Sequence, residues 1–157
     1  MASPLRFLIP LATFVLGGVL ALSLPLQAQP KPAEVRPAAQ ATVRHLGETE
    51  LRAIPSGKAS VRILARGDNA FIGLLTMAGG GQVPEHRDAS EEYIHVMKGS
   101  GKLFIDDKAY DLKAGTTVFM PANSKVRYEN GPEELMALQV FAGPESAAKY
   151  DGWKVRP

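Results

Sequence analysis

The side chains best suited to chemistry lie close together in the middle of the chain. His86 and Asp88 are two residues apart and would share a face of an extended strand. Glu92 opens the next apolar run and shares its phase with Ile94 and Val96, which predicts that its side chain points inward. If the two strands are neighbours, an imidazole and two carboxylates converge. Such a group suits Mn, Fe, Ni or Zn.

The same residues also allow a metal-free interpretation. His86 would then donate hydrogen bonds to Asp88 or Glu92, which would raise its pKa without any metal. Asp88 would be a turn residue whose carboxylate accepts hydrogen bonds from the backbone. Both interpretations stay open on the sequence. His95 is out of phase with Glu92 and is expected to face away from the interior.

The elements that position these residues are predicted to be short strands. Clusters of Gly and Pro interrupt the chain after Val43, and the segments between them are rich in β-branched and aromatic residues. Asp106-Asp107-Lys108 predicts a turn and makes 101–113 a hairpin. The pattern predicts an all-β sandwich or barrel. The expected strands are 61–64, 70–77, 92–97, 102–105, 116–120, 126–128 and 135–141.

The segment that contains the histidine resembles the first motif of the cupin superfamily. That motif is a Gly, five residues, His-any-His, three or four residues, Glu, six residues and a Gly. Four positions match it in register, namely Gly80, His86, Glu92 and Gly99. Asp88 stands where the motif has its second His.

A second cupin motif follows further along the chain. It consists of a Gly, five residues, Pro-any-Gly, two residues, His, three residues and an Asn. Gly115, Pro121 and Asn130 match it, whereas Asn123 stands at the second Gly and Val126 at the His. The resemblance covers roughly residues 60–142. It implies an all-β, double-stranded β-helix, the jelly-roll barrel of cupins.

The resemblance also implies a metal site, but an atypical one. A cupin metal is usually held by three His and one Glu, so His86 and Glu92 become expected ligands and Asp88 a substitute ligand. Val126 contributes nothing, because an alkyl side chain cannot coordinate. A divalent Mn, Fe, Ni or Zn ion on this reduced set would be weakly bound in an open site, and a metal-free barrel is the alternative.

Three functions are compatible with this sequence, and none of them assigns a catalytic residue. The first is a single-domain cupin that binds a small molecule in its barrel. The alternatives are a metal-dependent oxygenase or isomerase of a small polar substrate, and a non-catalytic interaction protein. The replacement of a ligand by Val favours the first function, because it makes the wall apolar. The residues expected to line that barrel are Ile94, Phe104, Phe119, Val126 and Tyr128.

Composition narrows the classes of partner. The chain has 157 residues, which allows one ordinary domain with additions. Its 18 Lys and Arg are interspersed with 16 Asp and Glu, so no basic face for nucleic acid is expected. Cysteine is absent, which excludes disulfides and thiolate ligands. A homodimer is the default expectation, because small cupins often dimerise.

The chain is expected to divide into four parts. Residues 1–28 carry one positive charge, Arg6, before an apolar run, which is typical of a signal peptide. The alternative is a membrane anchor formed by residues 5–26. A Pro- and Ala-rich linker is expected at 29–43, the cupin barrel at 44–145 and a C-terminal tail at 146–157. We therefore expect export to the periplasm or beyond, with no integral membrane domain after cleavage.

Overall fold

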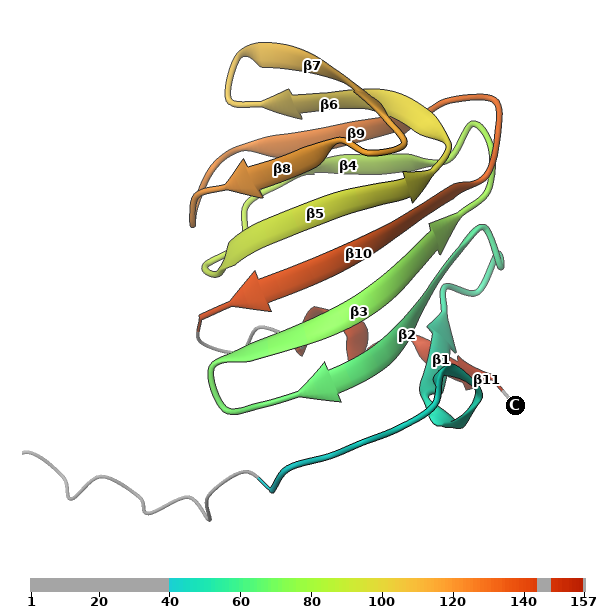
Figure 1. Cartoon of the computed structure of the whole chain (residues 1–157). Coiled ribbons are helices and arrows are strands. Elements are labelled where there is room, and N and C mark those ends of the chain that lie inside the picture. The colour runs from blue at the N-terminus through green and yellow to red at the C-terminus, as the bar shows by residue number, and fades with distance from the viewer. Residues whose placement is uncertain (1–39, 144–147, 157) are drawn as a thin grey trace, which may run out of the picture. The chain divides into compact units, whose positions relative to one another are not determined.

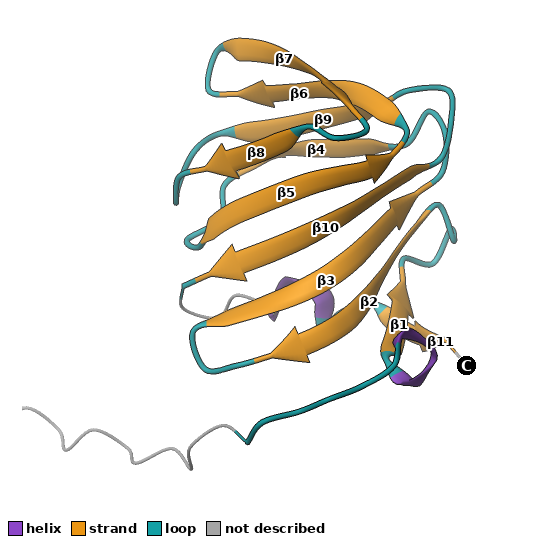
Figure 2. Ribbon diagram, in the orientation of Figure 1, coloured by secondary structure: helices purple, strands orange, loops and turns teal. Residues whose placement is uncertain are grey.

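The computed structural model describes residues 40–143 and 148–156. The predicted signal peptide, the alternative anchor and residues 29–39 of the predicted linker lie outside the described residues. Within them the protein is built almost entirely from β-strands (Figures 1 and 2). No helix in these two ranges is long and apolar enough to cross a lipid bilayer.

The strands agree with the predicted ones and extend them at several ends. Every segment expected to be a strand is one. The elements are η1 (Leu46–Glu48), β1 (Glu50–Ala53), β2 (Ala59–Arg66), β3 (Ala70–Met77), β4 (Gln82–His86), β5 (Glu91–Lys98), β6 (Ser100–Ile105), β7 (Lys108–Lys113), β8 (Thr117–Met120), β9 (Val126–Asn130), β10 (Leu135–Ala142), η2 (Ala148–Tyr150) and β11 (Lys154–Arg156).

Two antiparallel sheets face each other and enclose the core (Figure 1). The larger sheet has the order β11-β1-β2-β3-β10-β5-β8, and the smaller has the order β4-β9-β6-β7. The expected hairpin at 101–113 is β6 and β7, joined by a two-residue turn. The all-β jelly roll predicted from the sequence is therefore confirmed.

Buried and partly exposed residues alternate strictly along the central strands, and this alternation fixes which face of each strand turns to the core. In β3 and β10 every second residue is buried, as expected for strands with one face on a core. Leu75 of β3 and Val96 of β5 pack with Leu103 and Tyr128 of the smaller sheet. Burial of each such side chain stabilises the fold by about 1.5–3 kcal/mol. The same alternation decides which side chains reach the interior.

The turns between the strands need residues that tolerate positive φ. Gly99 has φ 84° and Gly115 has φ 87°, a region that glycine adopts without strain. Asn123, which stands where the second cupin motif has a Gly, has φ 65°. Asn enters this left-handed region more readily than most residues. The substitution therefore keeps the shape of the turn.

The C-terminal segment is part of the fold. β11 pairs with β1 at the edge of the larger sheet. The rings of Phe71 and Phe141 stack with their centroids 5.2 Å apart, and Tyr150 meets both edge-on. Trp153 packs edge-on against Tyr150 at 5.0 Å. The segment expected as a tail thus closes a second, aromatic core cluster.

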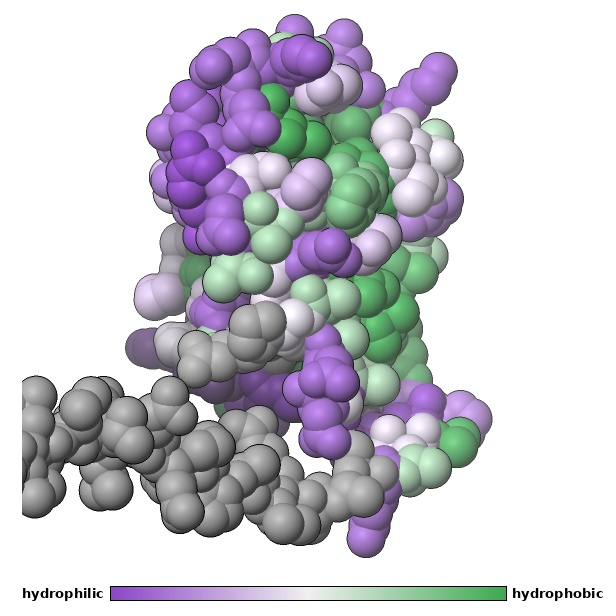
Figure 3. All heavy atoms as spheres, turned by 90° about the vertical axis from the view of Figure 1, so that its left-hand side faces the viewer, coloured by the Kyte–Doolittle hydropathy of each residue, from purple (hydrophilic) through white to green (hydrophobic). Residues whose placement is uncertain are grey.

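The outer face of the larger sheet also carries apolar side chains. Tyr93, Met97 and Phe119 are 41%, 50% and 50% exposed, and the rings of Tyr93 and Phe119 lie 5.0 Å apart. In Figure 3 the hydrophobic residues gather on the right-hand side of the view, and hydrophilic residues cover the upper left. The two sides of the barrel therefore differ in polarity.

Candidate functional site

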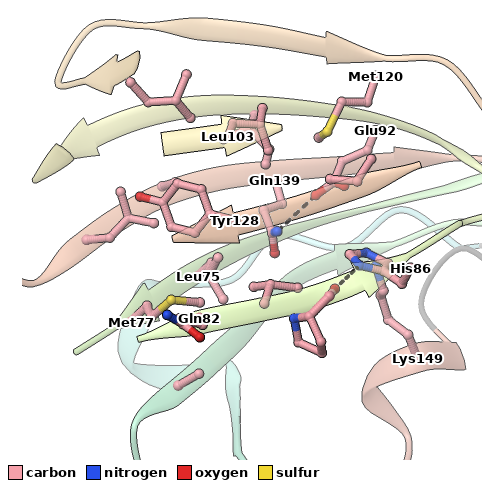
Figure 4. A pocket seen from close by; sticks show the side chains of 18 of the residues that line it. Leu75, Met77, Gln82, His86, Glu92, Leu103, Met120, Tyr128, Gln139 and Lys149 are labelled. Atoms are coloured by element: carbon pink, nitrogen blue, oxygen red, sulfur yellow. Dashed lines mark hydrogen bonds between the residues drawn. The ribbon is translucent and has the colours of Figure 1, made fainter. Parts of the chain in front are cut away.

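A cavity of about 370 Å³ lies between the two sheets (Figure 4). This volume is in the range of sites for small molecules. Most of the wall is apolar and comes from both sheets and from the C-terminal segment. The apolar lining residues are Ile54, Ala59, Leu75, Met77, Val83, Pro84, Ile94, Val96, Leu103, Leu112, Met120, Val126, Leu135, Ala137 and Trp153.

A chain of hydrogen bonds crosses the wall of this cavity. The Tyr150 hydroxyl donates to Gln139 Oε1 at 2.8 Å, and Gln139 Nε2 donates to Glu92 Oε1 at 3.0 Å. All three residues line the cavity and are buried. The amide of Gln139 is oriented by Tyr150, and it holds one oxygen of the Glu92 carboxyl in place.

The Glu92 carboxyl lies in an environment that disfavours its charge. Its side chain reaches the cavity from β5, and the residue is only 6% exposed. Burial raises the pKa of Glu92 to about 7, and the positive charge of Lys149 partly opposes this rise. Burial also raises the pKa of Tyr150. Glu92 is thus neutral in part of the population near pH 7.

A second polar cluster lies beside the first and joins three charged groups. His86 Nδ1 donates to the Pro84 carbonyl at 2.9 Å, and His86 Nε2 lies 3.3 Å from Asp88 Oδ2. Lys149 Nζ donates to the same Asp88 oxygen at 2.6 Å. The hydrogen bond with Asp88 raises the pKa of His86, and the two cationic partners lower that of Asp88 to about 2.

The two clusters come from different sheets. His86 ends β4 of the smaller sheet, whereas Glu92 lies near the start of β5 in the larger sheet. Asp88 belongs to the connection between these strands, does not line the cavity, and contacts His86 and Lys149 from behind. Figure 4 shows His86 and Lys149 at one end of the cavity and Met77 at the other.

Comparison with known proteins agrees with this architecture. Residues 73–141 match the family described as Cupin domain. An RmlC-like cupin from Shewanella frigidimarina superposes with a TM-score of 0.61 at 16% identity, over 66% of this chain and 92% of that one. A predicted oxalate decarboxylase from Thermotoga maritima gives 0.59 at 20% identity, over 65% and 99%. Residues 73–141 of the protein are therefore a cupin domain.

A curated relative is also similar to this cupin in sequence. Auxin-binding protein 1 of Arabidopsis thaliana is 31% identical over 93 residues, which are 52% of this chain. The match spans 47% of the relative, so the cupin covers about half of the relative's length. The solved structures are less than 25% identical and show the fold alone.

The polar residues of this cupin do not fit the usual set of three His and one Glu. Within residues 40–143 and 148–156, no group of three or more His, Asp or Glu side chains could hold a metal ion. His86 Nε2 already faces Asp88, and the Lys149 ammonium shares that carboxylate. Val126, whose Cα pairs with that of His86 across β4 and β9, offers no lone pair. The Lys149 ammonium lies at this end of the cavity, and its positive charge would repel a divalent cation.

The structure brings together some of the residues expected from the sequence and separates others. Ile94, Val126 and Tyr128 line the cavity of this cupin. Phe104 and Phe119 do not: they face outward, because their neighbours Leu103 and Met120 occupy the inward positions of β6 and β8. Phe104 packs instead under the Arg127 guanidinium, 3.7 Å from the ring centroid, and Phe119 packs against Tyr93.

Sequence reasoning missed four polar residues of this site, namely Gln82, Gln139, Lys149 and Tyr150. Gln139 left a signal, because it is the polar residue at an inward position of an otherwise apolar strand, between Ala137 and Phe141. Lys149 and Tyr150 left none, because they follow the barrel and lie outside both motifs. Only the packing of the C-terminal segment brings them to the cavity.

Proposed function

We propose that this cupin binds a small, mainly apolar molecule inside its barrel. The observation that carries the proposal is the cavity itself, about 370 Å³ in volume, with a mostly apolar wall and with His86, Glu92 and Lys149 at one end. Burial of apolar ligand surface supplies affinity in such a site, and a few polar groups fix orientation. The name of the similar auxin-binding protein 1 supports a small-molecule ligand.

The metal-dependent oxygenase or isomerase is the alternative, and the site supports it less well. A divalent ion on His86, Asp88 and Glu92 would require the Asp88 carboxylate to leave Lys149. It would also have to share the site with the Lys149 ammonium, whose charge repels a cation. Ligand binding without a metal needs neither change.

Calorimetric titration with the uncharged probe naphthalene-1-acetamide tests the proposal. We expect binding with a Kd below about 1 mM to the wild type. Leu75→Phe should weaken it at least about tenfold, because Leu75 lines the cavity and the larger ring fills it. Leu74→Phe is the matched control, since Leu74 directly precedes Leu75 in β3 and does not line the cavity. Equal effects of the two substitutions would place the ligand outside the barrel.

We further propose that the protein is exported, with residues 1–28 acting as the signal peptide. The support is the single positive charge followed by the apolar run. Expression of the full chain in a bacterial host and intact-mass measurement of the periplasmic fraction tests this. A product that begins near Gln29 is expected, whereas an uncleaved chain in the membrane fraction would favour the anchor.

A further inference from the structure

We propose that Lys149 binds the carboxylate of an apolar monocarboxylic acid in the cavity. The inference rests on the proposed function, because it names the chemical class of the ligand bound there. It assigns a binding role to a residue that lies outside both cupin motifs.

The position of the Lys149 ammonium supports this role. Lys149 belongs to η2 and lines the cavity, with Nζ 2.6 Å from Asp88 Oδ2 and 4.0 Å from the centre of the Phe141 ring. An ammonium group carries three N–H donors, and Asp88 takes one of them. Asp88 does not line the cavity, whereas Lys149 does, so the Asp88 carboxylate holds the ammonium without itself forming part of the wall.

The balance of charge at this end of the cavity favours an anion. The Lys149 ammonium and the His86 imidazole, whose pKa is raised by its hydrogen bond with Asp88, line the cavity and share the single carboxylate of Asp88. The other carboxyl, Glu92, is buried among apolar groups, which favours its neutral form. A ligand carboxylate would be attracted by the Lys149 ammonium, whereas a cationic ligand would be repelled by it.

The backbone around Lys149 is anchored, so the ammonium is held in place before a ligand binds. The Arg52 guanidinium donates to the Tyr150 carbonyl at 2.9 Å. The Tyr150 ring is fixed edge-on against Phe71 and Phe141, and its hydroxyl is bonded to Gln139. A group held in this way binds at a lower entropic cost than one on a free tail.

The test compares naphthalene-1-acetate with its uncharged amide by calorimetry, in buffer with EDTA. The wild type should bind the acid at least about tenfold more tightly than the amide, as expected for a charge-assisted hydrogen bond. Lys149→Met should remove this preference and change the affinity for the amide less than about twofold. Lys149→Arg should keep the preference, because it keeps the charge. Lys154→Met, an exposed lysine of β11, is the matched control and should behave as the wild type.

The outcomes separate this inference from the proposed function. Equal affinity for acid and amide in the wild type would overturn the role of Lys149 while leaving ligand binding in the barrel intact. A preference for the acid that survives in Lys149→Met would also overturn it. So would a preference that the wild type shows without EDTA and loses when EDTA is present. Binding of neither probe would contradict both proposals.

Discussion

The two cupin motifs lie side by side, because β4 pairs with β9 and β5 pairs with β8, and they contribute to the cavity in different ways. The first motif supplies His86 and Glu92, whose polar atoms reach the cavity. The second supplies Val126, whose alkyl group lines the same cavity beside His86 on the neighbouring strand. His86 and Glu92 can form hydrogen bonds and ion pairs, whereas Val126 can only exclude water.

The second motif nevertheless keeps the residues that its backbone needs. Asn130 is buried, and its side-chain amide donates to the carbonyls of Ala78 and Glu133 at 2.9 and 3.0 Å. Asn123 adopts the positive φ that the turn requires. The comparison teaches that the positions that hold the fold and the position that would hold a metal are independent of each other in this barrel.

The largest expected effect is the loss of stability in Asn130→Ala. The change leaves the Glu133 carbonyl without this donor, takes one of two donors from the Ala78 carbonyl, which also accepts from the Gly81 N–H, and removes the acceptor of the Tyr128 hydroxyl, which lies 3.0 Å from Asn130 Oδ1. We expect a loss of about 2–4 kcal/mol in the free energy of unfolding, measured by urea denaturation. Asn69→Ala, at an exposed turn, should change it by less than about 0.5 kcal/mol. A small effect at Asn130 would refute its structural role.

The next largest effect is the pH dependence of the free energy of unfolding, and it comes from Glu92 of the first motif. The Glu92 pKa of about 7 in the folded state is above its ordinary value of 4.5, so the folded protein binds more protons than the unfolded chain between these values. Stability should therefore fall as pH rises from about 5 to 8, by up to about 3 kcal/mol from this group.

Glu92→Gln isolates that contribution. The variant should lose clearly less stability than the wild type between pH 5 and pH 8, measured by urea denaturation at each pH. A part of the slope should persist, because the raised pKa of His86 stabilises the fold at low pH and this contribution is lost as pH rises through it. Identical slopes in the two proteins would show that the Glu92 carboxyl is not desolvated.

A smaller effect is expected when the second motif is given the imidazole that it lacks. Val126→His would place a second histidine opposite His86 and should raise the affinity for Zn²⁺ about tenfold or more over the wild type. Competition with a chromophoric chelator measures this. Arg127→His adds the same group on the other face of β9 and serves as the control, since Arg127 does not line this cavity. Unchanged affinity in Val126→His would contradict the pairing of the two strands.

The smallest effect should come from the turn of the second motif. Asn123→Ala should destabilise the fold by about 1 kcal/mol, because a Cβ without a local polar group is strained at φ 65°. Asn123→Gly should stay within about 0.5 kcal/mol of the wild type. Thermal denaturation of the three proteins ranks them. Equal losses in both variants would point to the side chain of Asn123 rather than to its backbone.

The alternation of inward-facing and outward-facing residues along each strand predicted several of the side chains that line the barrel. Glu92, Ile94 and Val96 alternate with exposed residues in β5 and all line the cavity, as their period of two indicated. Phe104 and Phe119, which were expected to line the barrel, do not follow this phase. Each is out of phase with a buried neighbour, Leu103 or Met120.

Contacts between distant segments could not be predicted in the same way. The sequence implied that His86 and Glu92 would converge if their strands were neighbours, but β4 and β5 belong to two different sheets, and the two residues line one cavity from there. Lys149 reaches Asp88 across 61 residues of sequence, through a segment that lies outside both motifs. No local pattern encodes that approach, because it depends on aromatic packing between Tyr150, Phe71 and Phe141.

Methyl NMR during a titration with naphthalene-1-acetate tests most directly that the ligand site is the interior of the barrel. The methyl resonances of Leu75, Val96 and Leu103, which line the cavity, should shift with a common binding isotherm. Those of Leu138 and Val140, which alternate with the buried residues of β10, should stay in place. Shifts confined to Leu138 and Val140 would contradict the account and place the ligand on the outer face of the larger sheet.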